Sequence, residues 1–139
     1  MAELWVPRVA VFLTLALISA CATYETEKKM NRYDYTIHQY EKAIRWGSYD
    51  VANSFRKPDE EGEHTPDFEW LKQFAVTSYE VVNQNMSDDR NEAQLTVDIR
   101  YYDKDTMKER QLVDRQRWRW DAESDVWLLE GPLPAFEQR

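Results

Sequence analysis

The sequence predicts an α+β fold in which two N-terminal helices pack on a curved four-stranded antiparallel sheet. Residues 91–103 alternate apolar and polar side chains with a period of two, which is typical of a strand with one buried face. Residues 111–121 repeat that alternation after a turn-like segment, residues 104–106, so the two runs should form a long antiparallel hairpin. Apolar residues at helical spacing from Tyr33 onwards supply the helices.

The first 20 residues have the organisation of a secretory signal peptide. Residues 9–18 are an uninterrupted apolar run, too short to span a bilayer of about 30 Å as a helix. Arg8 precedes the run, and the small residues Ser19 and Ala20 follow it, directly before Cys21. An ordinary signal peptide or a membrane anchor that happens to contain a cysteine is the alternative to a specialised leader.

The segment Ile18-Ser19-Ala20-Cys21 resembles the lipobox of bacterial lipoproteins. The resemblance implies that the leader is cut before Cys21 and that this residue carries a diacylglycerol and an amide-linked acyl chain such as palmitate. The chain would then be held on a membrane through Cys21. Ala22 is not the Asp that retains such proteins at the inner membrane of enteric bacteria, so the resemblance implies the periplasmic side of the outer membrane.

Length and charge limit the remaining functions. Of the 139 residues, about 119 remain after the leader, enough for one small domain. The net charge of −8 argues against nucleic acid as a partner, because phosphates would be repelled. With one cysteine, no internal disulfide can form. We therefore expect a leader over residues 1–20, the lipidated cysteine and a tether over 21–31, and a single domain over 32–139.

The tether lacks a clear apolar period, and the first helix follows it. Tyr33, Ile37, Tyr40 and Ile44 form a helical stripe, and Gly47 is a natural stop because it accepts a left-handed backbone. Ser48 should cap a second short helix. Its expected buried face is Val51, Ala52 and Phe55, and Pro58 ends it.

An acidic loop over residues 59–66 is expected to be exposed. Residues 68–74 form an apolar cluster that suggests one helical turn leading into a strand over 75–85. Turns at 87–90 and 121–125 connect the strands, and residues 126–130 make a short last strand. Regular structure should end after residue 131.

The domain resembles the nuclear transport factor 2-like superfamily, the cone fold of ketosteroid isomerase, scytalone dehydratase and the polyketide cyclases. The resemblance covers about residues 31–136 and is carried by the helix-turn-helix at 43–50, the long hairpin, Gln116-Arg117-Trp118 and Trp127-Leu128-Leu129. A cystatin-like sheet with a different helix arrangement is the main rival.

Enzymes of that superfamily place an Asp, His or Tyr deep in the cone, and three residues here are weak catalytic candidates. Asp34 and His38 are spaced i, i+4, but they lie beside the buried stripe, which favours a solvated pair. Asp114 shares the inward face of its strand with Leu112 and Trp118, so it is the better pocket acid. A structural hydrogen bond is the simpler role for it.

Any remaining pocket should be lined by inward aromatic and polar residues: Tyr33, Tyr40, Gln116, Trp118 and Trp120. The opposite face of the third strand carries Arg115, Arg117 and Arg119, a row available to a protein partner or to a second copy through the sheet. Asp98 on the neighbouring strand could pair with one of these arginines.

Cofactor chemistry has little support in the sequence. His64 has no second His or Cys nearby, and no Gly-rich phosphate loop occurs, so neither a metal nor a cofactor is expected. The favoured function is a non-catalytic, lipid-anchored binding or adaptor protein. The alternative is a small cone-fold enzyme, isomerase-, dehydratase- or cyclase-like, with Asp114 as the pocket acid or base.

Overall fold

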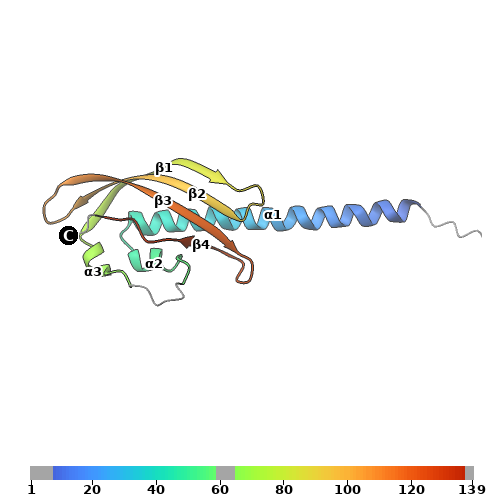
Figure 1. The fold of residues 1–139 in the computed structure, drawn as a ribbon, viewed down its shortest axis with the longest axis horizontal. Helices are drawn as coiled ribbons and strands as arrows, with labels where there is room; N and C mark the ends of the chain where they lie inside the picture. The colour runs from blue at the N-terminus through green and yellow to red at the C-terminus, as the bar shows by residue number, and fades with distance from the viewer. Residues whose placement is uncertain (1–7, 59–64, 137–139) are drawn as a thin grey trace, which may run out of the picture.

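The computed structural model describes residues 8–58 and 65–136, and side chains from Cys21 onwards within those ranges. It is an α+β arrangement of three helices and one four-stranded antiparallel sheet (Figure 1). The elements, in chain order, are α1 (Arg8–Arg45), α2 (Tyr49–Asn53), α3 (Phe68–Leu71), β1 (Phe74–Met86), β2 (Glu92–Asp103), β3 (Glu109–Asp121) and β4 (Val126–Glu130).

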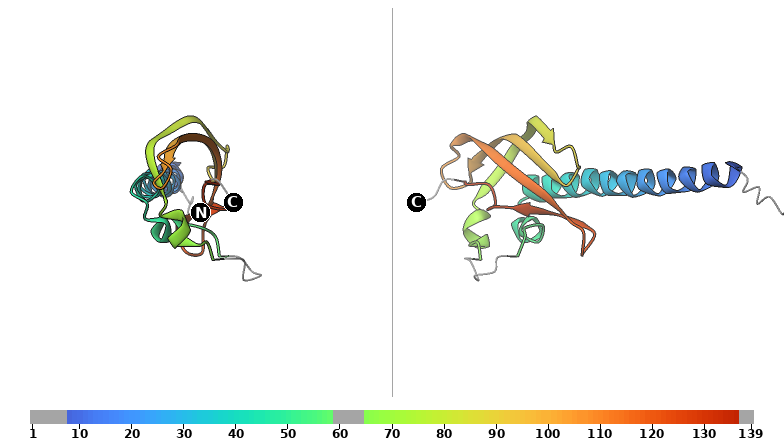
Figure 2. Two further views of the ribbon diagram at one scale, coloured as in Figure 1. Left: turned by 90° about the vertical axis from the view of Figure 1, so that its left-hand side faces the viewer. Right: turned by 45° about the vertical axis from the view of Figure 1, so that its right-hand side comes forward.

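The sheet is a simple meander in the order β1-β2-β3-β4, as the alternating sequence pattern predicts. Its strands curve around the C-terminal half of α1, with α2 and α3 below (Figure 2). The outer edge of β4 is covered, since the backbone N–H of Lys57 donates to Leu129 O and that of Leu129 to Phe55 O. In β1, the pairing with β2 shifts register after Val76 and again after Val81.

The core lies between the concave face of the sheet and the helices. Alternate residues of β2 from Ala93 to Tyr101 are buried there, and Trp118 and Trp127 add the largest side chains. From α1, Tyr33 packs edge-on against Trp127 with ring centroids 5.0 Å apart, and Tyr40 against Trp118 at 5.1 Å. This aromatic layer fills the space that the sheet curves around, so α1 is fixed by ring packing.

The end of α1 matches the predicted stop. Gly47 has a φ of +69°, its N–H donates to Ile44 O, and the N–H of Ser48 donates to Ala43 O. These two bonds form a Schellman motif, which closes the last turn of the helix. The turn sends the chain back across the sheet, where Tyr49 and Ala52 of α2 are buried.

The helices differ from the prediction in three ways. The expected tether, residues 21–31, is helical and belongs to α1, because no Gly or Pro interrupts it. The Ser48 side chain makes no capping hydrogen bond, so the predicted cap of α2 is wrong. Val51 is exposed and Phe55 lies just beyond α2, half-buried, because α2 is only five residues long.

The C-terminal segment contributes more to the core than the sequence suggested. Leu133 and Phe136 are buried after the last strand, and the Phe136 ring stacks on Phe74 at 5.5 Å with an interplanar angle of 8°. It also packs edge-on against Tyr49 and Tyr101. The segment thereby closes the end of the domain where β1 begins.

No helix in the described part of the chain combines the length and the apolar character needed to cross a membrane.

Candidate functional site

The inward face of β3 carries a connected set of polar side chains. The Gln116 amide nitrogen donates to Asp114 Oδ2 at 2.7 Å and to Tyr79 Oη at 2.9 Å, while the Trp118 ring N–H donates to Gln116 Oε1 at 3.0 Å. Gln116 therefore uses both amide hydrogens and its carbonyl on neighbours in β1 and β3. The set extends from the buried Trp118 to the half-buried Asp114.

Burial changes the acidity of this cluster. Desolvation raises the pKa of Asp114 above its ordinary value, and the hydrogen bond from Gln116 offsets part of that rise. Desolvation also raises the pKa of Tyr79, against the lowering effect of its bond with Gln116. The pKa of Tyr40 is raised well above 10 by burial first and by the Asp114 charge second. Asp114 therefore lies close enough to both phenols to influence them.

Two buried hydroxyls in the core have no hydrogen-bond partner in the described chain, those of Tyr33 and Tyr40. Burial, with a smaller contribution from Asp34, raises the pKa of Tyr33 to about 12. An unsatisfied buried hydroxyl costs free energy, on the order of 1–3 kcal/mol. Both rings nevertheless stay inside, because each packs edge-on against a buried tryptophan.

A pronounced hollow lies away from this cluster, between α1, β4 and the end of α2. It has a volume of about 340 Å³. The residues that line it come from the three elements and the segments beside them: Arg32, Tyr35, Thr36, Ser54, Phe55, Asp125, Val126, Trp127 and Leu128. Of the five residues expected to line a pocket, none belongs to this lining. Tyr33, Tyr40, Gln116 and Trp118 are buried core residues, and Trp120 is half-buried.

The other weak catalytic candidates lie on the surface. Asp34 and His38 are both exposed on α1, on the solvent side, and they do not join the Asp114 cluster. No group of three or more potential metal-ligating side chains occurs within residues that the structure describes. His64 lies outside the described residues. Cys21 is exposed on α1 as a free thiol.

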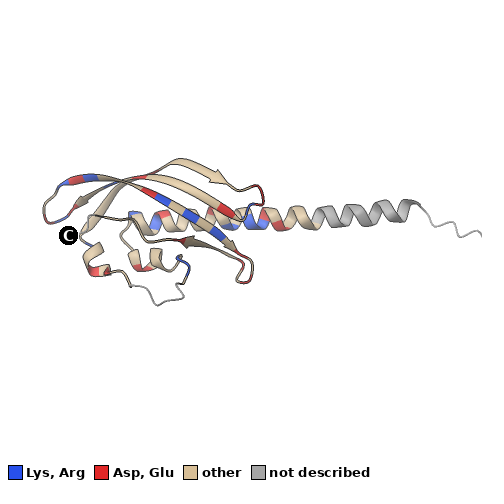
Figure 3. Ribbon diagram, viewed as in Figure 1, with Lys and Arg blue, Asp and Glu red and all other residues tan. Residues whose placement is uncertain are grey.

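The arginine row occupies the outer face of the sheet, where blue positions alternate along β3 (Figure 3). Arg119 forms ion pairs with Glu92 and Glu130, each at 3.0 Å, and so joins β2, β3 and β4. In the described chain, neither Arg115 nor Arg117 has an ion-pair partner. The predicted pair with Asp98 is wrong, since its carboxylate accepts from the Gln111 amide instead, at 2.6 and 2.7 Å.

A polar clamp that the sequence did not reveal fixes α1 to two of the hairpin turns, the one between β1 and β2 and the one between β3 and β4. Lys28 and Arg32 form ion pairs with Asp125 at 3.1 and 3.2 Å, and Lys29 Nζ donates to Asn91 Oδ1 at 2.7 Å. The Trp127 ring N–H donates to the Lys29 carbonyl at 3.1 Å. These contacts join residues 62 to 98 positions apart, so no local sequence pattern could predict them.

The comparisons with known proteins bear on the fold alone. No protein-family model and no curated protein matches this chain. A solved structure with a similar fold is the solution structure of a SEC-C motif containing protein from Rhodopseudomonas palustris. The two share 12% sequence identity over 64% of this chain and 67% of the other, with a TM-score of 0.51. At that identity the chain is similar to this protein in the arrangement of its elements.

Proposed function

We propose that this chain is a non-catalytic binding or adaptor protein, anchored by lipid on Cys21 at the periplasmic side of the bacterial outer membrane. The observation that carries the proposal is the position of Cys21 after its lipobox-like segment. The thiol is exposed, and it precedes the Lys28–Asp125 ion pair by seven residues, about 10 Å of helix. A modifying enzyme can therefore reach it without opening the domain.

The anchor would leave the folded domain beside the membrane rather than in it. Each buried methylene of an acyl chain contributes about 0.8 kcal/mol, so several chains hold a protein almost permanently. The polar clamp at Lys28, Lys29 and Arg32 fixes the domain to α1, the helix that carries Cys21. We also propose that the fold belongs to the nuclear transport factor 2-like cones, which the curvature of the meander around α1 supports.

The surface that we assign to a partner is the outer face of the sheet around Arg115 and Arg117. Both side chains are exposed, and in the described chain both are unpaired, within a protein of net charge −8. An acidic protein surface fits this patch, because it would bring carboxylates to guanidinium groups that have none. Arg119 is already neutralised by two carboxylates and contributes less.

The test of the anchor is cell fractionation of the Cys21→Ser variant beside a Thr23→Ser control on the same exposed turn. The variant should accumulate as an unprocessed precursor or in the soluble fraction, whereas the control should stay with the outer membrane. A Cys21→Ser chain that sediments with the outer membrane at the mass of the parent protein contradicts the proposal.

A second candidate function is a small cone-fold enzyme that uses Asp114 as an acid or base. The raised pKa of this carboxyl and the unpartnered hydroxyl of Tyr40 favour it. The two functions can be compared in a strain whose growth depends on this chain. If the chain is an enzyme, Asp114→Asn should lose function while it folds and localises normally. The adaptor predicts that Asp114→Asn keeps function and that Arg115→Glu with Arg117→Glu loses it.

A further inference from the structure

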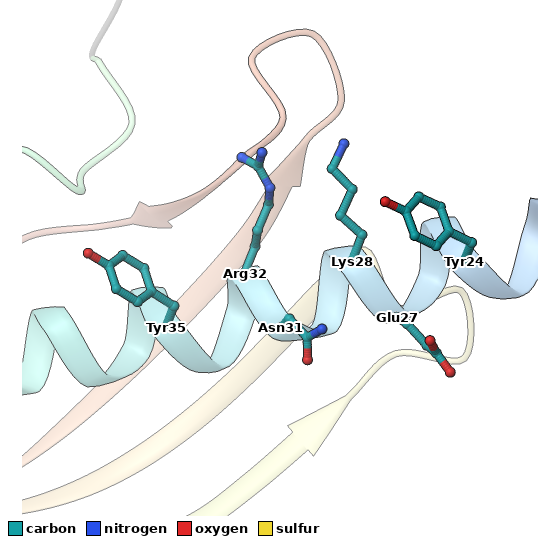
Figure 4. Close-up of a pocket in the computed structure, with 6 residues that line it drawn as sticks. All are labelled: Tyr24, Glu27, Lys28, Asn31, Arg32 and Tyr35. Carbon is teal, nitrogen blue, oxygen red and sulfur yellow. The ribbon is translucent and has the colours of Figure 1, made fainter.

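The middle of α1 has an uncovered face, bordered on one side by the turn between β3 and β4, where Lys28 and Arg32 pair with Asp125. Tyr24 and Tyr35 lie on this face, each 66% exposed. Between them runs an open trough of about 400 Å³ along the helix (Figure 4). Its lining comes from α1 alone: Tyr24, Glu27, Lys28, Asn31, Arg32 and Tyr35. Two aromatic side chains exposed to this extent on one helix face are typical of a surface that binds another protein.

The spacing of four residues along the trough identifies the kind of surface that fits. Tyr24, Lys28, Asn31 and Tyr35 are separated by four, three and four residues. This is the alternation of the a and d positions in a heptad repeat, which brings side chains to the seam between two parallel helices. The trough therefore has the geometry of one half of a short parallel coiled coil.

We propose that α1 pairs in parallel with α1 of a second copy of this chain over residues 24–35. In that pair each tyrosine meets its own counterpart, Tyr24 on Tyr24 and Tyr35 on Tyr35, and aromatic pairs of this kind are favourable. Asn31 meets Asn31 at the seam, where the two amides can hydrogen-bond. The two-fold axis runs along the helices, which makes the contact isologous.

The charges beside the seam are complementary in a parallel pair and not in an antiparallel pair. Glu27 precedes Arg32 by five residues, and in a parallel pair a g position faces the e position five residues later in the partner. The two side chains leave α1 on opposite sides of the trough, as that pairing requires (Figure 4). Each Glu27 thus meets an Arg32 of the other copy. In an antiparallel pair, each Glu27 would face Glu27 of the other copy and each Arg32 would face Arg32, so like charges would repel.

Both members of this ion pair are accessible in the single chain. Glu27 is exposed and has no ion-pair partner among the described residues. The Arg32 side chain contacts Asp125 but is still 45% exposed, so it can accept a second carboxylate. The contact is short, and Lys28 meets Lys28 at the seam, so the dimer should be reversible. If Cys21 carries lipid as proposed above, the parallel arrangement places both anchors in one membrane, which raises the local concentration.

The first experiment is disulfide trapping in the full chain with Asn31→Cys. In a parallel pair this residue faces its counterpart across the seam, and mild oxidation should give a covalent dimer. Glu25→Cys is the control, because that exposed residue lies on the same helix about a quarter turn away from the centre of the seam. Each cysteine is introduced into the Cys21→Ser chain, because Cys21 is exposed and lies one heptad before Lys28, where it would face its own counterpart. The Cys21→Ser chain without a second cysteine supplies the blank. Equal trapping at positions 25 and 31, or none at 31, overturns the proposal.

The second experiment reverses the charges within the Asn31→Cys chain. Glu27→Arg alone sets like charges against Arg32 of the partner, and Arg32→Glu alone does the same with Glu27, so each should lose the covalent dimer. Co-expression of the two variants should restore it as a mixed dimer, because their charges are again opposite. Glu25→Arg, the same reversal two residues away, should keep the dimer. A dimer that survives Glu27→Arg, or one that co-expression does not restore, contradicts helix pairing and points to another surface.

Discussion

Single residues in this domain divide sharply between core and surface. On β3, successive side chains alternate between the aromatic layer and solvent, so neighbours one position apart have opposite roles. Trp118 is fully buried against Tyr40, and its ring N–H is bonded to Gln116. Arg117 is exposed on the other face. The same backbone segment thus carries a fully buried side chain next to an exposed one.

This contrast gives a stability prediction. Trp118→Ala leaves a large cavity and an unpaired Gln116 carbonyl, and should lower the free energy of unfolding by about 3–5 kcal/mol. Arg117→Ala removes an exposed side chain and should cost under about 1 kcal/mol. Urea denaturation of both variants measures the two values, and similar losses would mean that the strand faces the opposite way.

The Asp114 carboxyl predicts a pH effect of definite sign. Its pKa is raised in the folded state by burial, so the native protein holds a proton that the unfolded chain releases. Stability from this group is therefore present below the unfolded pKa of about 3.9 and is lost as pH rises through the folded pKa. Asp114→Asn has no carboxyl to ionise at this position, so its stability should not decrease for this reason. The free energy of unfolding of the parent, compared with that of Asp114→Asn, should therefore decrease as pH rises above about 4.

Asp121 supplies the matched control for that titration. Its pKa is lowered, chiefly by the hydrogen bond from Ser124, so its stabilisation is present above the unfolded pKa and is lost as pH falls through the folded pKa. We therefore expect two opposite trends as pH rises. The free energy of unfolding of the parent should increase relative to that of Asp121→Asn, and it should decrease relative to that of Asp114→Asn. Denaturation curves between pH 3 and pH 7 measure both trends. The same trend for both variants would contradict the assignment of Asp114 to a desolvated site.

At the scale of elements, the junction between α1 and α2 determines where the helix layer lies. The Schellman motif at Gly47 ends α1 and aims α2 under the sheet. A Cβ at position 47 would meet only Tyr49, at 3.8 Å, which is ordinary contact. The requirement for glycine therefore comes from the positive φ and not from crowding.

Gly47→Ala should destabilise the domain by about 1–2 kcal/mol, the cost of a left-handed backbone for a residue with a Cβ. Gly47→Asn should cost less, because asparagine tolerates that conformation better. Thermal unfolding of the two variants provides the measurement. If alanine and asparagine cost the same, steric contact and not backbone conformation governs this turn.

Elements with a strong local pattern could be read from the sequence, and elements held by distant contacts could not. Alternation located β2 and β3, the turn at 121–125 located β4, and Gly47 located the end of α1, because each signal lies within the element or directly beside it. The helical state of residues 21–31 was missed because polar residues without an apolar period look like a linker. The clamp at Asp125 and the core position of Phe136 depend on the completed fold.

The candidate site shows the same division. The inward direction of Asp114 and Gln116 follows from their place in the β3 alternation. Their bonding with Tyr79 does not, because the register of β1 depends on its irregularities. The hollow beside β4 is made by three separate elements, and so it lies where no single stretch of sequence indicates a pocket.

At the scale of the whole molecule, an aromatic-cored domain packs on part of α1, and α1 extends well beyond the sheet (Figure 1) and carries Cys21. Among the described side chains, Arg115 and Arg117 offer unpaired charge on the sheet, and exposed rings include Tyr24 and Tyr35 on α1 and Trp46 just after it. The interior is occupied by packed rings and a satisfied glutamine. This distribution is the basis on which we propose binding at the surfaces.

The proposal that Cys21 becomes a lipidated N-terminus can be tested by mass spectrometry of the N-terminal peptide from membrane-extracted protein. We expect a peptide that begins at Cys21 and carries the mass of a diacylglycerol and an acyl group. A mature protein that begins elsewhere, or a peptide in which the Cys21 thiol is unmodified, would contradict it.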